Sequence, residues 1–456
     1  MPTLNLEYYR KQAKSLLHFA QTGDTAALER IALHRGNVDP AQVQLHDAQL
    51  AIAREQGFAS WPKFRAFVEQ SGLDDQALVE AFIDAATSDL KRADEILSAN
   101  PKIAHAGFYV ALVLGDARQV KHAVAKSPQL ATRKSGPQKC EPLVYACFSR
   151  YANPAASKRA GALVETAGVL LRHGADPNTS IVTAEFPDNP LSCLYAATGL
   201  NNNVALAQLL LEGGANPNDG ESLYHSTEHP DLECMKLLLR HGARPDEANA
   251  LNHMLDREDP EGVRLLLEAG ADPNKVPGAI WRGRSAAVIG ALLDGGADPN
   301  MRSPHGETSY AMALFNGQHE VAELLASRGA DTTLSDLDRY LAAPDVAPPP
   351  NIDWEGRERL LADLAMHHRT DAVRALLAAG APIDARGEHG GTALHWACWK
   401  GYADLVELLL NAGASVTIED RQFHATPAGW LDHGRRTCHE GAGDYPAVAR
   451  LLGVSS

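Results

Sequence analysis

A nine-residue phrase recurs along this chain and constrains its fold more than any other feature. Residues 170–178 read Leu-Leu-Arg-His-Gly-Ala-Asp-Pro-Asn, and residues 210–218 read Leu-Leu-Glu-Gly-Gly-Ala-Asn-Pro-Asn. A leucine pair followed by glycine and alanine is typical of a helix end, where glycine takes the left-handed conformation that stops the helix. Other copies, several of them weaker, surround Gly242, Gly270, Gly296, Gly329, Gly380 and Gly413.

The copies recur at intervals of about thirty residues, which indicates a solenoid of stacked repeats. A single helix pair cannot bury its apolar face, so each unit must pack against its neighbours. The 37 glycines and the 6% of aromatic residues agree with many short helices joined by glycine turns. We therefore predict an all-α solenoid, whose long concave face favours a binding function.

The balance of charges argues against nucleic acid as a partner. The chain has 42 Lys and Arg against 57 Asp and Glu, a formal net charge of −15, and no run of Lys or Arg longer than two. A phosphate-binding surface requires a basic patch, and this sequence offers no candidate for one. We expect partners other than DNA or RNA.

Cysteine usage and the apolar runs predict the cellular compartment of the protein. The six cysteines are scattered and form no Cys-x-x-Cys pair, which favours a reducing compartment. The first ten residues lack the basic-then-apolar pattern of a signal peptide, and the longest apolar run, 108–114, is too short to span a bilayer. The expectation is a soluble, cytoplasmic monomer that does not enter a membrane.

The recurring phrase divides the chain into four parts. Residues 1–72 lack it and read as a cap of four helices, expected at 4–20, 25–33, 41–55 and 60–69. Degenerate and then regular repeats follow at 75–334, and further repeats fill 357–456. Between them, residues 335–356 form a Pro-rich linker. Three consecutive prolines, Pro348–Pro350, cannot continue a helix, so 344–350 is predicted as an extended surface loop.

One repeat carries a family signature. Residues 391–397 read Gly-Thr-Ala-Leu-His-Trp-Ala, which closely resembles the ankyrin signature Thr-Pro-Leu-His-x-Ala, and weaker copies lie at 308–313 and 426–430. On these residues the chain resembles the bacterial ankyrin-repeat proteins over about 75–456. The resemblance implies an ankyrin-type helical solenoid behind the N-terminal cap. It also implies that His395 forms a hydrogen bond between repeats rather than acting in catalysis.

The resemblance also indicates where function lies. In ankyrin repeats, the residue after the signature histidine and the one three further on point from the inner helix into the concave groove. They share one helix face because one turn separates them. In this chain the two positions are occupied by Tyr145 and Phe148, His225 and Glu228, His253 and Asp256, Met312 and Phe315, Asp363 and Met366, Trp396 and Trp399, and Trp430 and His433.

The C-terminal positions predict an aromatic binding patch on two neighbouring repeats. Exposed Trp and Tyr side chains beside a basic residue are typical of binding hot spots. The alternative interpretation is a local core, with Trp399 or Trp430 packed under the insertion at 434–444. The predicted partner-binding residues are Trp396, Trp399, Lys400, Tyr402, Trp430, His433, Tyr145, Phe148, Met312 and Phe315.

Catalytic motifs are missing from the sequence. There is no phosphate loop, dinucleotide-binding glycine motif, His-Glu-x-x-His or Gly-x-Ser-x-Gly. We therefore predict a non-enzymatic scaffold or adaptor that binds another protein and needs no cofactor. The alternative is an enzyme or small-ligand receptor with a pocket lined by histidines and carboxylates. In that alternative His225, His253 and Asp256 could hold a metal, although stacked repeats separate equivalent positions by about 10 Å.

Overall fold

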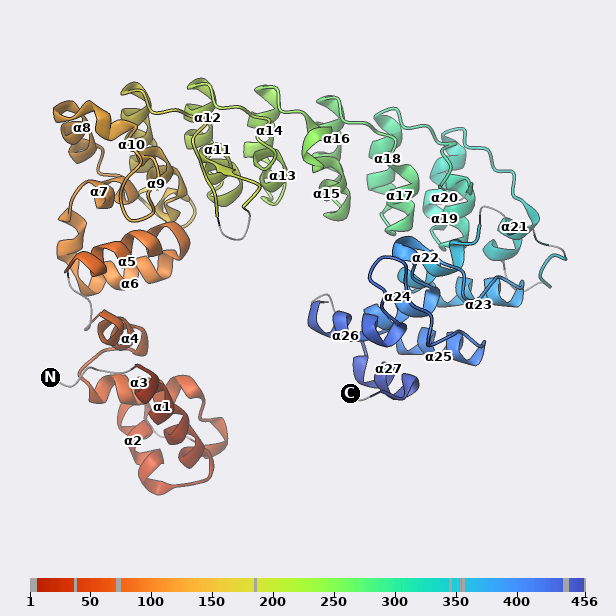
Figure 1. The fold of residues 1–456 in the computed structure, drawn as a ribbon, viewed down its shortest axis with the longest axis horizontal. Coiled ribbons are helices and arrows are strands. Elements are labelled where there is room, and N and C mark those ends of the chain that lie inside the picture. Colours follow the sequence, from red (N-terminus) through yellow and green to blue (C-terminus); the bar gives the residue numbers. More distant parts are fainter. Residues whose placement is uncertain are drawn as a thin grey trace. The chain divides into compact units, whose positions relative to one another are not determined.

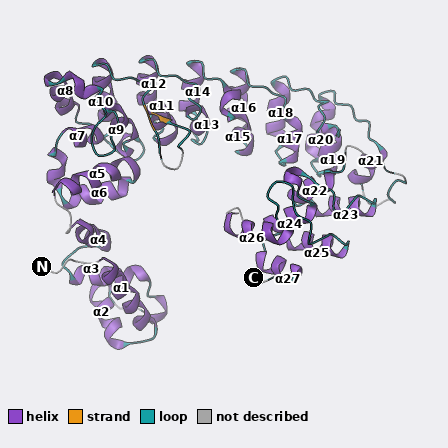
Figure 2. Cartoon of the chain, in the orientation of Figure 1, coloured by secondary structure: helices purple, strands orange, loops and turns teal. Residues whose placement is uncertain are grey.

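The computed structural model describes residues 6–36, 39–70, 75–183, 187–304, 306–343, 347–350, 352, 354, 357–437 and 443–454. The chain folds into two compact units, Met1–Ala248 and Asn249–Ser456. Helices make up nearly all of the regular structure (Figure 2). The all-α fold predicted from the repeats is confirmed.

The first unit begins with four helices that share one core. They are α1 Leu6–Gln21, α2 Thr25–Arg35, α3 Leu45–Glu55 and α4 Trp61–Gln70. Their bounds lie close to those expected from the sequence, except that α3 starts four residues later than the expected start at 41. The core of this cap consists of small and aliphatic side chains, most of them from α1–α3, closed by Phe64 and Val68 of α4.

Helix pairs follow the cap in two rows. Helices α8, α10, α12 and α14 contact one another in succession, as do α7, α9, α11 and α13 (Figure 1). Their bounds are α5 Asp75–Ser88, α6 Leu90–Ala99, α7 Phe108–Leu114, α8 Ala117–Lys126, α9 Pro142–Phe148, α10 Ala160–Arg172, α11 Cys193–Tyr195, α12 Val204–Glu212, α13 Ser222–Ser226 and α14 Glu233–Arg240. Two short strands, β1 Ser180–Ile181 and β2 Leu191–Ser192, pair antiparallel with Ser180 opposite Ser192.

The second unit continues the same pattern. Its helices are α15 Ala250–Asp256, α16 Pro260–Glu268, α17 Val276–Trp281, α18 Ala286–Asp294, α19 Ser309–Phe315, α20 His319–Ser327, α21 Asp336–Ala342, α22 Leu360–Met366, α23 Thr370–Ala378, α24 Ala393–Lys400, α25 Ala403–Asn411, α26 Pro427–Thr437 and α27 Tyr445–Leu452. Within this unit α22, α24 and α26 contact one another in succession, and α23, α25 and α27 do the same beside them.

The glycine of the recurring phrase is required by backbone conformation. Gly174, Gly214 and Gly242 have φ of 89°, 95° and 86°. A Cβ added to any of them would meet no atom within 4 Å, so the left-handed backbone and not crowding selects glycine here. The predicted glycine stop is therefore confirmed at these positions.

The asparagine that ends the phrase links one repeat to the next. The Asn178 amide donates to the carbonyl of Gly214 at 3.1 Å and accepts from the Asn216 N–H at 2.7 Å. Asn218 makes the same two bonds to Gly242 and Arg244. These side chains satisfy backbone groups in the next turn, so the phrase sets the spacing of the stack as well as the helix end.

Part of the Pro-rich segment is a surface loop inside the second unit. Residues 347–350 are non-helical and largely exposed, whereas Pro344–Val346 lie outside the described residues. The stretch 335–356 expected as a linker also contains a helix, α21 Asp336–Ala342. The helices on either side remain joined, because α21 contacts both α19 and α23. The Arg369 guanidinium also donates to the Asn316 carbonyl, and His367 stacks on Trp281 with ring centroids 5.5 Å apart.

Candidate functional site

Three tryptophans from two neighbouring repeats meet in the second unit. Trp396 and Trp399 lie on α24, and Trp430 lies on α26. The ring centroids of Trp396 and Trp430 are 5.0 Å apart with an interplanar angle of 78°, and those of Trp396 and Trp399 are 5.5 Å apart at 67°. These edge-to-face contacts are favoured by the ring quadrupoles and hold the indoles in fixed orientations.

The expectation that the inner-helix apolar side chains stand in water is wrong at six positions. Trp396 is only 3% exposed and Trp430 only 7%, because each covers the other and both pack against Ala362. Side chains from neighbouring repeats likewise approach the other rings, such as Tyr109 beside Tyr145. The buried side chains are Tyr145, Phe148, Met312, Phe315, Trp396 and Trp430.

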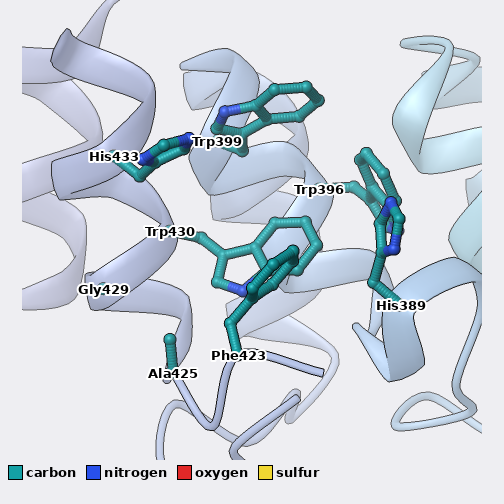
Figure 3. A pocket seen from close by; sticks show the side chains of 8 residues that line it. All are labelled: His389, Trp396, Trp399, Phe423, Ala425, Gly429, Trp430 and His433. Atoms are coloured by element: carbon teal, nitrogen blue, oxygen red, sulfur yellow. The ribbon is translucent and has the colours of Figure 1, made fainter. Parts of the chain in front are cut away.

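The tryptophans nevertheless wall an open pocket of about 330 Å³. Phe423, at 59% exposure, lies on its wall, and His389 approaches both Phe423 and Trp396 with ring centroids within 6 Å. Figure 3 shows the indole rings around the opening, with His389 and His433 at opposite sides of the view. The lining residues are His389, Trp396, Trp399, Phe423, Ala425, Gly429, Trp430 and His433.

A buried carboxylate fixes the loop that carries Phe423. Asp420 accepts hydrogen bonds from the backbone N–H groups of Gln422, Phe423 and Ala425, and from the Trp430 indole at 2.9 Å. Burial alone would raise the pKa of Asp420, but these hydrogen bonds outweigh it and lower the pKa to about 2. The ionised carboxylate therefore ties the loop to the Trp430 ring.

His395 holds the two repeats in register. Its Nδ1 accepts the Thr392 N–H at 3.1 Å, and its Nε2 donates to the Ala425 carbonyl of the next repeat at 3.1 Å. Burial lowers the pKa of this imidazole, in agreement with a neutral ring that accepts at one nitrogen and donates at the other. The inter-repeat hydrogen bond expected for His395 is confirmed.

The predicted patch is only partly assembled. Trp396, Trp399, Trp430 and His433 come together in the pocket, whereas Lys400 and Tyr402 are not part of its wall. Lys400 lies over the Trp399 ring, with Nζ 4.5 Å from the ring centroid, and Tyr402 stacks on His368 at 3.9 Å. Sequence reasoning missed His389 and Phe423, because both lie in turns outside the two inner-helix positions.

The insertion expected to cover the tryptophans contacts the end of α24 through its described residues. A Cβ on Gly434 would lie 2.0 Å from the Trp399 carbonyl oxygen, and the hydroxyl of Tyr445, the residue after the insertion, donates to the same oxygen at 3.2 Å. These contacts involve the main chain of Trp399 and not the indole rings. Trp430 is buried together with Trp396 and Ala362 and not under the described part of the insertion, of which residues 438–442 lie outside the described residues.

The histidines and carboxylates proposed for the alternative function are divided between the two units. His225 lies in the first unit, with Glu221 and Glu228 oxygens 3.1 and 3.0 Å from its two ring nitrogens. His253 and Asp256 lie in the second, where Asp256 pairs with Arg282 at 3.6 Å. In the described part of the chain, no group of three or more His, Cys, Asp or Glu residues is placed to hold a metal ion.

Stacked helix pairs with left-handed glycine stops define a helical-repeat protein. Two family models match the chain: ankyrin repeats in three copies at residues 193–276, and ankyrin repeats in many copies at 361–410. The chain therefore contains ankyrin repeats, which are protein–protein interaction modules. No helix among the described residues combines the length and the apolar character needed to cross a membrane.

Three curated relatives are similar to part of this chain. An ankyrin repeat-containing protein of Treponema pallidum is 32% identical over 29% of this chain and 39% of its own length. The mouse B-cell lymphoma 3 protein homolog is 30% identical over 30% of this chain and 28% of its length. The potassium channel AKT2/3 of Arabidopsis thaliana is 24% identical over 31% of this chain and 20% of its own length. The matches thus span less than half of each relative.

Proposed function

We propose that this protein is a non-enzymatic scaffold or adaptor that binds a partner protein, and that the pocket walled by Trp396, Trp399 and Trp430 is its main contact. The ankyrin repeats support the class of function. The pocket supports the location, since a partner's side chain that enters it would be surrounded by rings on several sides. Anchors held in desolvated aromatic pockets of this kind dominate binding energy at protein interfaces.

The burial of the rings changes how they would act. Trp396 and Trp430 already pack against each other, so they serve as rigid walls and not as flexible side chains that must be ordered on binding. A preformed pocket costs little conformational entropy when it is filled, which favours affinity. Phe423, His389 and His433 are the exposed parts of the wall, and Trp399 is half-buried.

We further propose that the protein acts in the cytoplasm as a monomer, with a protein and not nucleic acid as its partner. Among the described residues, Cys140, Cys147, Cys193, Cys234 and Cys398 are free thiols, which supports a reducing compartment. The formal net charge of −15 supports a partner other than nucleic acid.

Site-directed photo-cross-linking tests the proposal. Phe423→p-benzoylphenylalanine places the cross-linker on the pocket wall, and Glu407→p-benzoylphenylalanine places it on an exposed position of α25 outside the wall. In lysate of the native host, we expect one protein to be cross-linked from position 423 and not from 407. Equal capture from both positions, or none from 423, would contradict the pocket as the main contact.

A further inference from the structure

A second cavity, of about 390 Å³, opens in the same unit as the tryptophan pocket, the pocket walled by the three indoles described above. Side chains of α17, α22 and the turns beside them line it. Trp281 of α17 and His367, which follows α22, stack in its wall with ring planes 15° apart. The cavity thus has an aromatic wall, but its lining also carries charged side chains.

Two observations place the second cavity next to the tryptophan pocket. Glu388 lines the cavity, and the following residue, His389, lines the pocket. Met366 lines the cavity and also packs against the buried cluster that contains Trp396 and Trp430. One segment of a partner protein can therefore reach both hollows.

Positive charges predominate around the His367 ring. Burial lowers the pKa of this imidazole, and the Asp363 carboxylate opposes that shift. Three cations lower the pKa further, those of Lys400, Arg282 and Arg369. The surroundings of the ring are therefore positive, in a chain whose formal net charge is −15.

Two exposed arginines line the second cavity. Arg282 lies 3.6 Å from the Asp256 carboxylate, whereas Arg359 has no ion pair within the described ranges. The lining carboxylates offset these charges only in part. Asp363 is 6% exposed, and Glu388 lies 3.9 Å from the imidazole of the next residue. An incoming carboxylate would supply the partner that Arg359 lacks.

We infer that the second cavity binds an acidic side chain of the partner protein, next to the apolar side chain that fills the tryptophan pocket. This inference rests on the proposed function and specifies the chemistry of the partner. Arg359 and Arg282 supply the contacts, because planar guanidinium groups match a carboxylate in charge and in geometry. Linking the two contacts in one segment strengthens both, since the first holds the second in place.

Calorimetric titration of the full chain with synthetic peptides tests this inference. Each probe is an N-acetylated peptide amide with phenylalanine first, a spacer of one to four glycines, and glutamate last. The matched probe has glutamine in place of glutamate. At the best spacing and low salt, the glutamate peptide should bind about two- to tenfold more tightly. The difference should shrink at about 0.5 M salt, which screens exposed charges.

Variants of the arginine locate the contact. Arg359→Gln should abolish the preference for glutamate, and Arg359→Glu should reverse it in favour of a peptide with lysine last. Arg264→Gln, at an exposed position of α16 outside the cavity, also removes one positive charge and should keep the preference. The Trp281 indole signal in nuclear magnetic resonance, assigned with Trp281→Phe, should move further with the glutamate peptide than with the glutamine peptide.

The inference is overturned if the glutamate and glutamine peptides bind equally at every spacing, or if neither binds. It is also overturned if Arg264→Gln reduces the preference as much as Arg359→Gln, because the effect would then come from overall charge. The proposed function fails separately, when no partner cross-links from position 423 although the preference for glutamate holds. A cross-linked partner together with equal binding of the two peptides would instead reject only the acidic contact.

Discussion

The Trp430 indole donates to the Asp420 carboxylate at 2.9 Å, from a helix to the turn that precedes it. Asp420 is 2% exposed and also accepts three backbone N–H groups of that turn. One carboxylate thereby positions a pocket wall, Trp430, and the loop that presents Phe423. This bond is the link between the repeat fold and the candidate site.

Asp420→Asn should destabilise the second unit by about 2 kcal/mol at neutral pH. The folded-state pKa of Asp420 is about 2, below its value of about 3.9 in unfolded chains, so the charged form contributes stability above pH 4. That contribution is lost as the pH falls from about 4 towards 2. In urea unfolding, the difference in free energy of unfolding between the wild type and Asp420→Asn should therefore narrow as the pH falls over this range. A difference that does not change with pH would contradict the role assigned to Asp420.

Trp396→Ala should lower the free energy of unfolding by about 3–5 kcal/mol, because the nearly buried ring packs between Trp430 and Ala362. Trp399→Ala should cost clearly less, since this ring is half-buried. Thermal unfolding of the two variants provides the comparison. Equal, small losses would mean that the Trp396 ring stands in solvent, as the sequence alone suggested.

Gly434→Ala should destabilise the contact between α24 and α26 by about 1–3 kcal/mol. The added Cβ would lie 2.0 Å from the Trp399 carbonyl oxygen, a backbone atom that cannot move without shifting α24. Gly161→Ala on α10 is the control, because a Cβ there meets nothing within 4 Å and alanine favours the helix. In chemical denaturation, Gly434→Ala should lower the free energy of unfolding and Gly161→Ala should raise it. A change of the same sign in both variants would refute the close contact.

Asn178→Ala should cost about 1 kcal/mol through loss of its two hydrogen bonds to the next repeat. Hydrogen exchange should increase first at the Asn216 N–H, which loses its acceptor. Asn411→Ala, at an exposed position on α25, serves as the comparison and should leave exchange at Asn216 unchanged. Unaltered protection of Asn216 in the Asn178 variant would show that the asparagine bonds do not hold the turns together.

The N-terminal helices and the repeat pattern could be predicted because their signals are local. A glycine stop, a leucine pair and a proline run each act within a few residues, and their repetition leaves a stack as the only way to bury the apolar faces. The role of His395 was also predictable, since the signature around it places the imidazole beside Thr392 and the following repeat.

The candidate site was predicted only in part, because its side chains come from segments that are distant in sequence. Helical spacing determined by itself that Trp396 and Trp399 share one face of their helix, but not what lies against that face. Only the tertiary structure decided that Trp430 covers Trp396, that Asp420 takes up one indole N–H, and that His389 and Phe423 join the wall. Burial depends on contacts between segments distant in sequence, and periodicity along one segment does not specify them.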